Sequence, residues 1–301
     1  MRKEHFQNNL KEDFKLLYKK KVINIDSKNL NIIAIFAHPD DLSIFCAGTL
    51  ARWAEEGHNI YALCCTSGEV GTLRRDLTKT QVAATREKEL KAANEIIGVK
   101  ETIILDYPDA GFINSAELRE RLVYFVRKLK ADRVVTFDPW VAYEVHPDHL
   151  IVGRMAAEAA AFAAFPLLYI NQIKNGVEPY ECSEVWFMGL LGHKPNYFVD
   201  ISSTLEKKIE AALKFEATLE LLAHLFAPKI DPANVSPDEL VKLTKYANRL
   251  YRSMATVIGK KVDIKAAEAF FVQKTLPGHF DNFQQLTSEM LGNPSEQPKI
   301  Y

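Results

Sequence analysis

The 301-residue sequence lacks several features that mark common functional classes. Its four cysteines show no Cys-x-x-Cys spacing, which argues against a disulfide framework. The 38 basic and 39 acidic residues nearly balance, so charge gives no reason to expect binding to nucleic acid or to an anionic membrane. No uninterrupted apolar stretch approaches the roughly 20 residues that a membrane-spanning helix needs.

Glycine-rich phosphate-binding strings are also missing. No Gly-x-Gly-x-x-Gly string follows the first apolar run, and there is no Walker A string, which disfavours a dinucleotide site. The two glycines within 67–72 indicate only a loop. The N-terminal stretch lacks the apolar centre of a secretory signal, so we expect a cytoplasmic protein.

The sequence does contain a regular alternation of short apolar strands and longer helices. Strands are predicted at 31–37, 60–65, 102–105 and 133–137, with helices near 48–56, 80–97 and 115–130 between them. This βαβ pattern predicts an α/β fold, with a Rossmann-like, doubly wound, mostly parallel sheet and helices on both faces.

The rest of the chain extends this arrangement. Two more strands are predicted at 184–191 and 197–201, helices over 203–226 and 237–258, and a weak strand at 269–273. We therefore predict a helical lead-in over 1–29, an α/β domain over 30–202 and a C-terminal helical extension over 203–301 that packs on the same domain.

Two short strings stand out after predicted strands. His38-Pro-Asp-Asp41 follows the strand at 31–37, and His146-Pro-Asp-His149 follows the strand at 133–137 after a loop. Ligands of doubly wound sheets bind beyond the carboxyl ends of the strands. We therefore expect the two strings to meet at one edge of the sheet.

These strings supply the parts for metal-assisted hydrolysis. A catalytic zinc takes three protein ligands and a water, and His38, Asp41 and His149 can supply the three. Such a metal lowers the pKa of its water towards about 7 and polarises a carbonyl group. Two histidine ligands favour zinc over magnesium, which disfavours a magnesium-dependent phosphohydrolase.

The remaining polar residues of the strings suit the other catalytic roles. Asp40 points away from an ion held by its neighbour and is free to act as general base. His146 would face the substrate, to stabilise an oxyanion or protonate a leaving amine. Asp148 could orient a neighbouring imidazole.

The two strings resemble those of the PIG-L/LmbE family of zinc-dependent N-deacetylases, which act on N-acetylglucosamine-containing substrates. The similarity runs over residues 31–201. Within the family, the archaeal diacetylchitobiose deacetylases are most similar, on these strings: Asp138-Pro139-Trp140, Tyr143-Glu144, His146–His149 and His193–Ile201.

The resemblance implies the same roles for the residues of the strings. It assigns His38, Asp41 and His149 to zinc, Asp40 to the base and His146 to the oxyanion or the leaving amine. Arg86 and Asp109 match family positions linked to sugar binding. From their types and positions, the aromatic residues Trp140 and Tyr143 could stack on sugar rings. We therefore expect deacetylation of an amino-sugar substrate, releasing acetate and a free amine.

The sequence also departs from the common family pattern. Ser43 stands where many members have glutamate, and 215–218 reads Phe-Glu-Ala-Thr where many carry His-x-Ser-Gln. The resemblance implies a homo-oligomer, a trimer or a hexamer. Two alternatives stay open: a zinc amidase acting on another small-molecule amide or a thiol-sugar conjugate, and a non-catalytic zinc- or sugar-binding member.

Overall fold

A sheet with strand order β3-β2-β1-β4-β5-β7-β6 runs through the protein. The computed structural model describes residues 29–111, 115–142, 144–188, 194–227, 230–231 and 233–275, so nearly all of the predicted lead-in lies outside it. The strands are β1 (Asn31–Phe36), β2 (Asn59–Thr66), β3 (Glu101–Tyr107), β4 (Arg133–Phe137), β5 (Glu184–Met188), β6 (Tyr197–Asp200) and β7 (Ala267–Lys274).

Strands β1 to β5 are parallel, and β7 runs antiparallel to its neighbours β5 and β6. The predicted mostly parallel, doubly wound sheet is therefore confirmed. The strand order reverses between β1 and β4, which pair with each other through Ile32–Ala34 and Arg133–Val135. Such a reversal leaves a crevice beyond the strand ends, where doubly wound proteins bind ligands.

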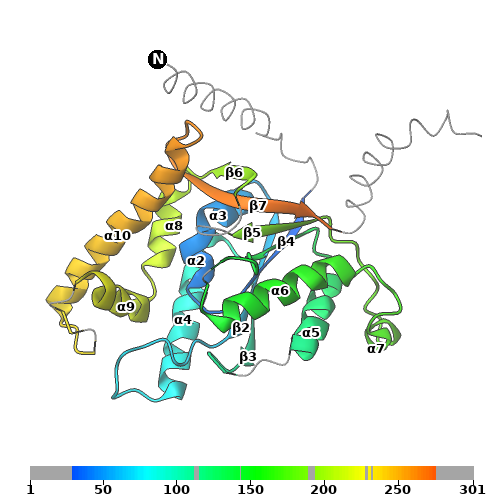
Figure 1. The fold of residues 1–301 in the computed structure, drawn as a ribbon, viewed down its shortest axis with the longest axis horizontal. Helices are drawn as coiled ribbons and strands as arrows, with labels where there is room; N and C mark the ends of the chain where they lie inside the picture. The colour runs from blue at the N-terminus through cyan, green and yellow to red at the C-terminus, as the bar shows by residue number, and fades with distance from the viewer. Residues whose placement is uncertain are drawn as a thin grey trace, which may run out of the picture.

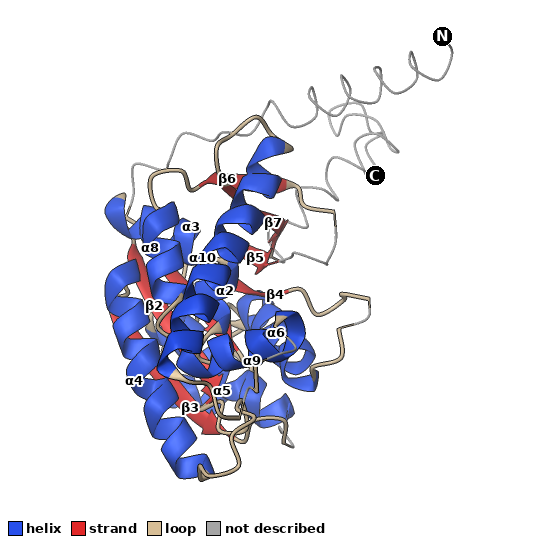
Figure 2. Cartoon of the chain, turned by 90° about the vertical axis from the view of Figure 1, so that its left-hand side faces the viewer, coloured by secondary structure: helices blue, strands red, loops and turns tan. Residues whose placement is uncertain are grey.

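Helices cover both faces of this sheet (Figure 1). They are α2 (Asp41–Phe45), α3 (Ala47–Glu55), α4 (Lys79–Ile97), α5 (Ser115–Lys128), α6 (Pro147–Phe162), α7 (Ile170–Lys174), α8 (Leu205–Ala212), α9 (Glu216–Phe226) and α10 (Pro237–Lys260). Helix α8 packs on α2, α3 and α4, whereas α5 and α6 pack together against the other face. Figure 2 looks onto the side that carries α4, α8 and α10. No helix among the described residues is long and apolar enough to cross a bilayer.

The structure contains two short helices, α2 and α7, that the sequence pattern does not predict, and it differs from the predicted C-terminal part in two ways. The helix predicted over 203–226 is two helices, because the chain breaks at 213–215 between α8 and α9. The C-terminal region also contributes strand β7, which lies between β5 and β6 in the sheet, so this region is not purely helical. The predicted domain boundaries at 29/30 and 202/203 stay predictions.

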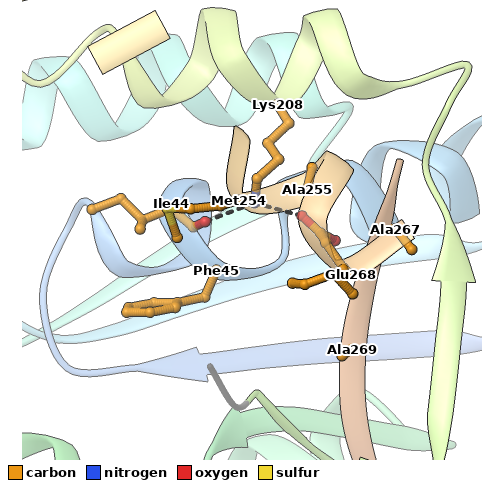
Figure 3. A pocket seen from close by; sticks show the side chains of 9 residues that line it. Ile44, Phe45, Lys208, Met254, Ala255, Ala267, Glu268 and Ala269 are labelled. Atoms are coloured by element: carbon orange, nitrogen blue, oxygen red, sulfur yellow. Dashed lines mark hydrogen bonds and ion pairs between the residues drawn. The ribbon is translucent and has the colours of Figure 1, made fainter. Parts of the chain in front are cut away.

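A buried ion pair fixes the break between α2 and α3, near the end of β1. Lys208 on α8 donates to the carbonyl oxygen of Ile44 and to Glu268 on β7, both at 2.6 Å (Figure 3). Glu268 in turn accepts the backbone N–H groups of Gly48 and Thr49 at the start of α3. The pair thus supplies hydrogen-bond partners to the last turn of α2 and to the first turn of α3. These bonds fix the position of α2 and therefore of Asp41, its first residue. The small pocket beside the pair has an otherwise mainly apolar lining, so we assign it no chemistry.

Helix α6 approaches β4 closely at Gly153. A Cβ atom at this position would lie 2.7 Å from the carbonyl oxygen of Phe137, so only glycine fits there. One turn earlier on the same helix, the His149 ring stacks on the Phe137 ring with centroids 4.2 Å apart. The close packing thus brings the second string of the sequence against the carboxyl end of β4.

Candidate metal and catalytic site

The two strings meet at the end of the sheet between β1 and β4, as the strand pattern predicts. His38 follows β1, Asp41 begins α2, and His149 lies in the first turn of α6. Pro147 occupies the first helical position, which suits a proline because it has no N–H group to leave unpaired. All three side chains are largely buried, so each is held by its surroundings.

The three side chains form a triangle with edges close to the separations that zinc requires, although its two edges at Asp41 end on different carboxylate oxygens. His38 Nδ1 lies 3.2 Å from His149 Nε2 and 3.4 Å from Asp41 Oδ2, and His149 Nε2 lies 3.5 Å from Asp41 Oδ1. Tetrahedral zinc with bonds of about 2.0–2.1 Å separates its ligand atoms by roughly 3.3–3.4 Å. These residues therefore fit a zinc ion in both type and spacing.

Each histidine of the triangle has a carboxylate at its other ring nitrogen. His38 Nε2 lies 3.4 Å from Asp148 Oδ2 and 3.2 Å from Asp109 Oδ1. His149 Nδ1 lies 3.3 Å from Glu144 Oε2. A metal-binding histidine usually donates its second N–H to such an acceptor, which fixes the tautomer and the ring. The surroundings of both rings therefore suit metal binding through His38 Nδ1 and His149 Nε2.

A second group of donors lies on the other side of the His38 ring. Ligand atoms of His38, Asp109, His146 and Asp148 all lie within 4.8 Å of one another, so this group could also hold a metal ion. Its carboxylates already have backbone donors: Asp148 accepts the N–H of Ala110 at 2.8 Å, and Asp109 accepts that of Val70 at 3.3 Å. Asp41 Oδ2 likewise accepts the backbone N–H of His38 at 2.7 Å, so backbone donors do not distinguish the two sides. We favour the Asp41 side because both His38 and His149 contact Asp41 there.

The carboxylates make this end of the sheet favourable for positive charge. Burial alone would lower the pKa of His38, but Asp41, Asp109 and Asp148 outweigh it and raise the pKa to about 12. Burial would raise the pKa of Asp41, yet His38 and His149 hold it well below its usual range. The acids that stabilise the imidazolium would equally stabilise a bound cation.

Asp40 precedes Asp41 in the chain, and its carboxylate is held by two donors from distant elements. Its Oδ1 accepts a 2.5 Å ion pair from Arg86 Nη2 on α4, and its Oδ2 accepts a 2.6 Å hydrogen bond from Thr218 Oγ1 on α9. Arg86 is only 3% exposed and also donates to the carbonyl oxygen of Gly71. The structure thus pairs Arg86 with the predicted base; its sugar contact stays a prediction.

His146 lies beside the triangle. Its ring centroid is 4.4 Å from that of His38 and 4.8 Å from that of His149, and its backbone N–H donates to Glu144 Oε1. The ring is half-buried, and burial lowers its pKa. Its Nδ1 has no hydrogen-bond partner among the described residues. A neutral ring with an uncommitted nitrogen is suited to meet a reacting group.

The structure places two of the predicted sugar-binding residues, Asp109 and Trp140, in different surroundings. Asp109 is buried and points at His38. Trp140 is 49% exposed and contacts Phe187 and Arg154, in a pocket between α6 and the β5 and β7 strands. Tyr143 lies outside the described residues. Sugar contacts of Trp140 and Tyr143 therefore stay predictions.

Two residues of the site received no role in the sequence analysis. One oxygen of the Glu144 carboxylate lies at His149 Nδ1, and the other accepts the backbone N–H of His146. The Thr218 hydroxyl donates to Asp40. Glu144 stands five residues before the predicted ligand His149, and this spacing is a local signal of its role. No local signal marks Thr218, because α9 reaches Asp40 only through the tertiary fold.

Comparison with known proteins agrees with this geometry. Residues 33–160 match the family described as PIG-L: GlcNAc-PI de-N-acetylase. Diacetylchitobiose deacetylase of Thermococcus kodakarensis is 34% identical over 213 residues, which are 70% of this chain and 79% of that protein. A Rhodococcus erythropolis 1D-myo-inositol 2-acetamido-2-deoxy-alpha-D-glucopyranoside deacetylase is 29% identical, over 68% of this chain and 73% of its own length.

Solved structures show the same fold. N,N'-diacetylchitobiose deacetylase from Pyrococcus horikoshii superposes with a TM-score of 0.71 at 28% identity, covering 92% of this chain and 94% of that one. The hydratase GalB of Pseudomonas putida, at 19% identity and a TM-score of 0.62, covers 83% of this chain and 97% of its own and shares the fold alone. The fold by itself therefore does not set the reaction. With its identity to the Thermococcus protein and its matching family segment, the chain belongs to the PIG-L family.

Proposed function

We propose that this protein is a zinc-dependent N-deacetylase that hydrolyses the acetamide of an N-acetylglucosamine-type sugar, releasing acetate and a free amine. The observation that carries the proposal is the triangle of His38, Asp41 and His149, with Asp40 adjacent to Asp41 in the chain. The named activities of the relatives, all deacetylases of amino sugars or their conjugates, support the choice of bond.

The chain's own residues divide the work of amide hydrolysis. When bound, zinc would acidify a water molecule and polarise the acetyl carbonyl. Asp40, paired with Arg86, would accept the proton of the attacking water. A ring N–H of His146 would donate to the oxygen on which negative charge develops. The proton taken up by Asp40 would then pass to the departing amine.

Glu144, Asp148 and Asp109 would keep the two ligand rings in place. Each lies at the ring nitrogen that faces away from the Asp41 carboxylate. Their contribution is orientation, because a ring fixed before binding loses less freedom when the metal and substrate arrive. This role for Asp148 agrees with the one predicted from the sequence.

The proposal is tested by measuring acetate release from N-acetylglucosamine, diacetylchitobiose and longer oligomers, with metal analysis on the same protein. We expect release from at least one sugar by the zinc-loaded protein and loss of release after chelation, restored by zinc. Release only from other amides or thiol-sugar conjugates would favour the amidase alternative. A zinc-loaded protein inert on every acetamide would favour a non-catalytic member.

We further propose that the protein is a homo-oligomer. Large apolar side chains around α6 are exposed in the single chain, with Val145 at 89% and Leu167 at 85%. Apolar surface of this kind commonly marks a contact between proteins. Light scattering on the purified protein distinguishes a trimer or hexamer from a monomer, and a monomer at all concentrations would contradict the proposal.

A further inference from the structure

Both oxygens of the Asp40 carboxylate are held, and the two donors come from two helices far apart in the sequence, α4 and α9. Arg86 Nη2 bonds Oδ1 and Thr218 Oγ1 bonds Oδ2. A carboxylate has about four lone-pair sites, so two remain for a water or a substrate group. Hydrogen bonds to an ionised acceptor are about twice as strong as neutral ones, so the pair fixes the plane of the carboxylate.

Helix α9 is built to keep Thr218 in this position. Its first turn is anchored by a hydrogen bond from the Glu216 N–H to Glu89 Oε1, 2.9 Å long, and Glu89 lies one turn from Arg86 on α4. Phe215 and Leu219, on either side of Thr218 in the sequence, are 0% and 3% exposed. Thr218 itself is β-branched and 7% exposed, so its hydroxyl has little freedom to turn away.

We infer that Thr218 is a positioning residue for the reaction, whose hydroxyl sets the orientation of the Asp40 carboxylate towards the attacking water. This inference rests on the proposed function, because it takes Asp40 as the base. It also gives a role to a segment that departs from the common family string, since Thr218 ends the Phe-Glu-Ala-Thr sequence at 215–218.

The inference predicts a specific change in the kinetics of Thr218 variants. A misplacement of about 1 Å in a catalytic group can cost roughly 100-fold in rate. Thr218→Val removes the hydroxyl at nearly constant shape, so we expect kcat to fall about 10- to 100-fold with KM and zinc content nearly unchanged. Thr218→Ser keeps the hydroxyl and should restore most of the loss.

A matched control is available on α10. The Thr244 hydroxyl bonds the carbonyl oxygen of Leu240 within its own helix, so Thr244→Val makes the same chemical change away from the site. We expect this variant to keep the wild-type kcat. If Thr218→Val keeps kcat within twofold of this control, or loses zinc in place of turnover, the inference is overturned.

A double-mutant cycle with Asp40 separates positioning from a general structural effect. If Thr218 acts through Asp40, Thr218→Val should change the residual kcat of Asp40→Asn by less than about twofold, because the two residues then act as a unit. If Thr218→Val lowered kcat by the same factor in the Asp40→Asn background as in the wild-type protein, Thr218 would act elsewhere, and the inference would be overturned.

Crystal structures of the Thr218 variants give a readout that needs no activity. The Asp40 carboxylate should rotate away from its position in Thr218→Val and keep it in Thr218→Ser. An unmoved carboxylate in Thr218→Val contradicts the inference even if turnover falls. Absence of acetate release from the wild-type protein would contradict the proposed function instead, so the two failures are distinguishable.

Discussion

The Nδ1 atom of His38 and the Nε2 atom of His149 lie 3.2 Å apart, although 111 residues separate the two histidines in the chain. The contact exists because β1 and β4 are neighbours at the reversal of the strand order, and each strand delivers one string to the same end of the sheet. The meeting of the two strings at the proposed metal site is thus a direct consequence of the topology.

Glu144 supports His149, so its loss should weaken metal binding without abolishing it. Glu144→Gln keeps the shape but removes the charge at His149 Nδ1, and we expect zinc affinity to fall about 10- to 100-fold. His149→Ala, which removes a ligand, should lose far more. Competition with a chromogenic chelator measures both, and equal affinities for Glu144→Gln and wild type would refute the role of Glu144.

Asp40 should matter for turnover and hardly at all for metal. Its oxygens bond Arg86 and Thr218 and take no part in the triangle, so Asp40→Asn should leave zinc bound. Because general-base catalysis contributes about 100- to 10,000-fold, kcat should fall by that factor. Zinc analysis and acetate release on one sample check this, and an undiminished kcat would exclude Asp40 as the base.

The Lys208–Glu268 pair should be costly to break. Both side chains are 3% exposed, and Lys208→Met leaves the buried Glu268 carboxylate without its cation, between the end of α2 and the start of α3. We expect a loss of about 3–5 kcal/mol in the free energy of unfolding, measured with urea. Lys207→Met, whose exposed pair with Glu55 should contribute at most about 1 kcal/mol, is the control. Similar stabilities for the two variants would contradict this account.

Glu89 should make the protein less stable as pH rises. Burial raises the pKa of Glu89 from its usual 4.5 to about 7. The folded protein then holds this proton more tightly than the unfolded chain, so the contribution to stability is complete below about pH 4.5 and is lost as pH rises through about 7.

Glu89→Gln tests this sign. The variant keeps an oxygen to accept the Glu216 N–H, and we expect it to be more stable than wild type at pH 8, by up to about 1 kcal/mol after solvent screening. The advantage should vanish near pH 4. Thermal unfolding across this range measures it, with exposed Glu87→Gln as control, and a stability difference independent of pH would rule out the assignment.

Much of the fold follows from local pattern. The sequence predicts strand β4 at its observed bounds, Arg133–Phe137, and α4 within one residue, because Gly98 marks the end of that helix. The break between α8 and α9 was missed because apolar residues continue at helical spacing through 213–215, where no glycine or proline interrupts them. The five-residue α2 is too short for periodicity to show.

The candidate site also contains residues that the local sequence indicates and residues that only the tertiary fold brings in. The ligand strings are local and contain their own chemistry, so residue types and spacing were enough to predict them. The partners of Asp40 come from α4 and α9, which only the three-dimensional packing brings together. The place of β7 between β5 and β6 likewise depends on long-range pairing that a single weak strand signal does not specify.

The most direct test of the account is the position of the metal in a crystal of the zinc-loaded protein, found by anomalous scattering at the zinc edge. We predict one strong peak bonded to His38 Nδ1, Asp41 and His149 Nε2, with Asp40 outside the coordination sphere. A peak on the opposite side of the His38 ring, bonded to Nε2 with Asp109 and Asp148, would contradict the assignment of ligands and base together.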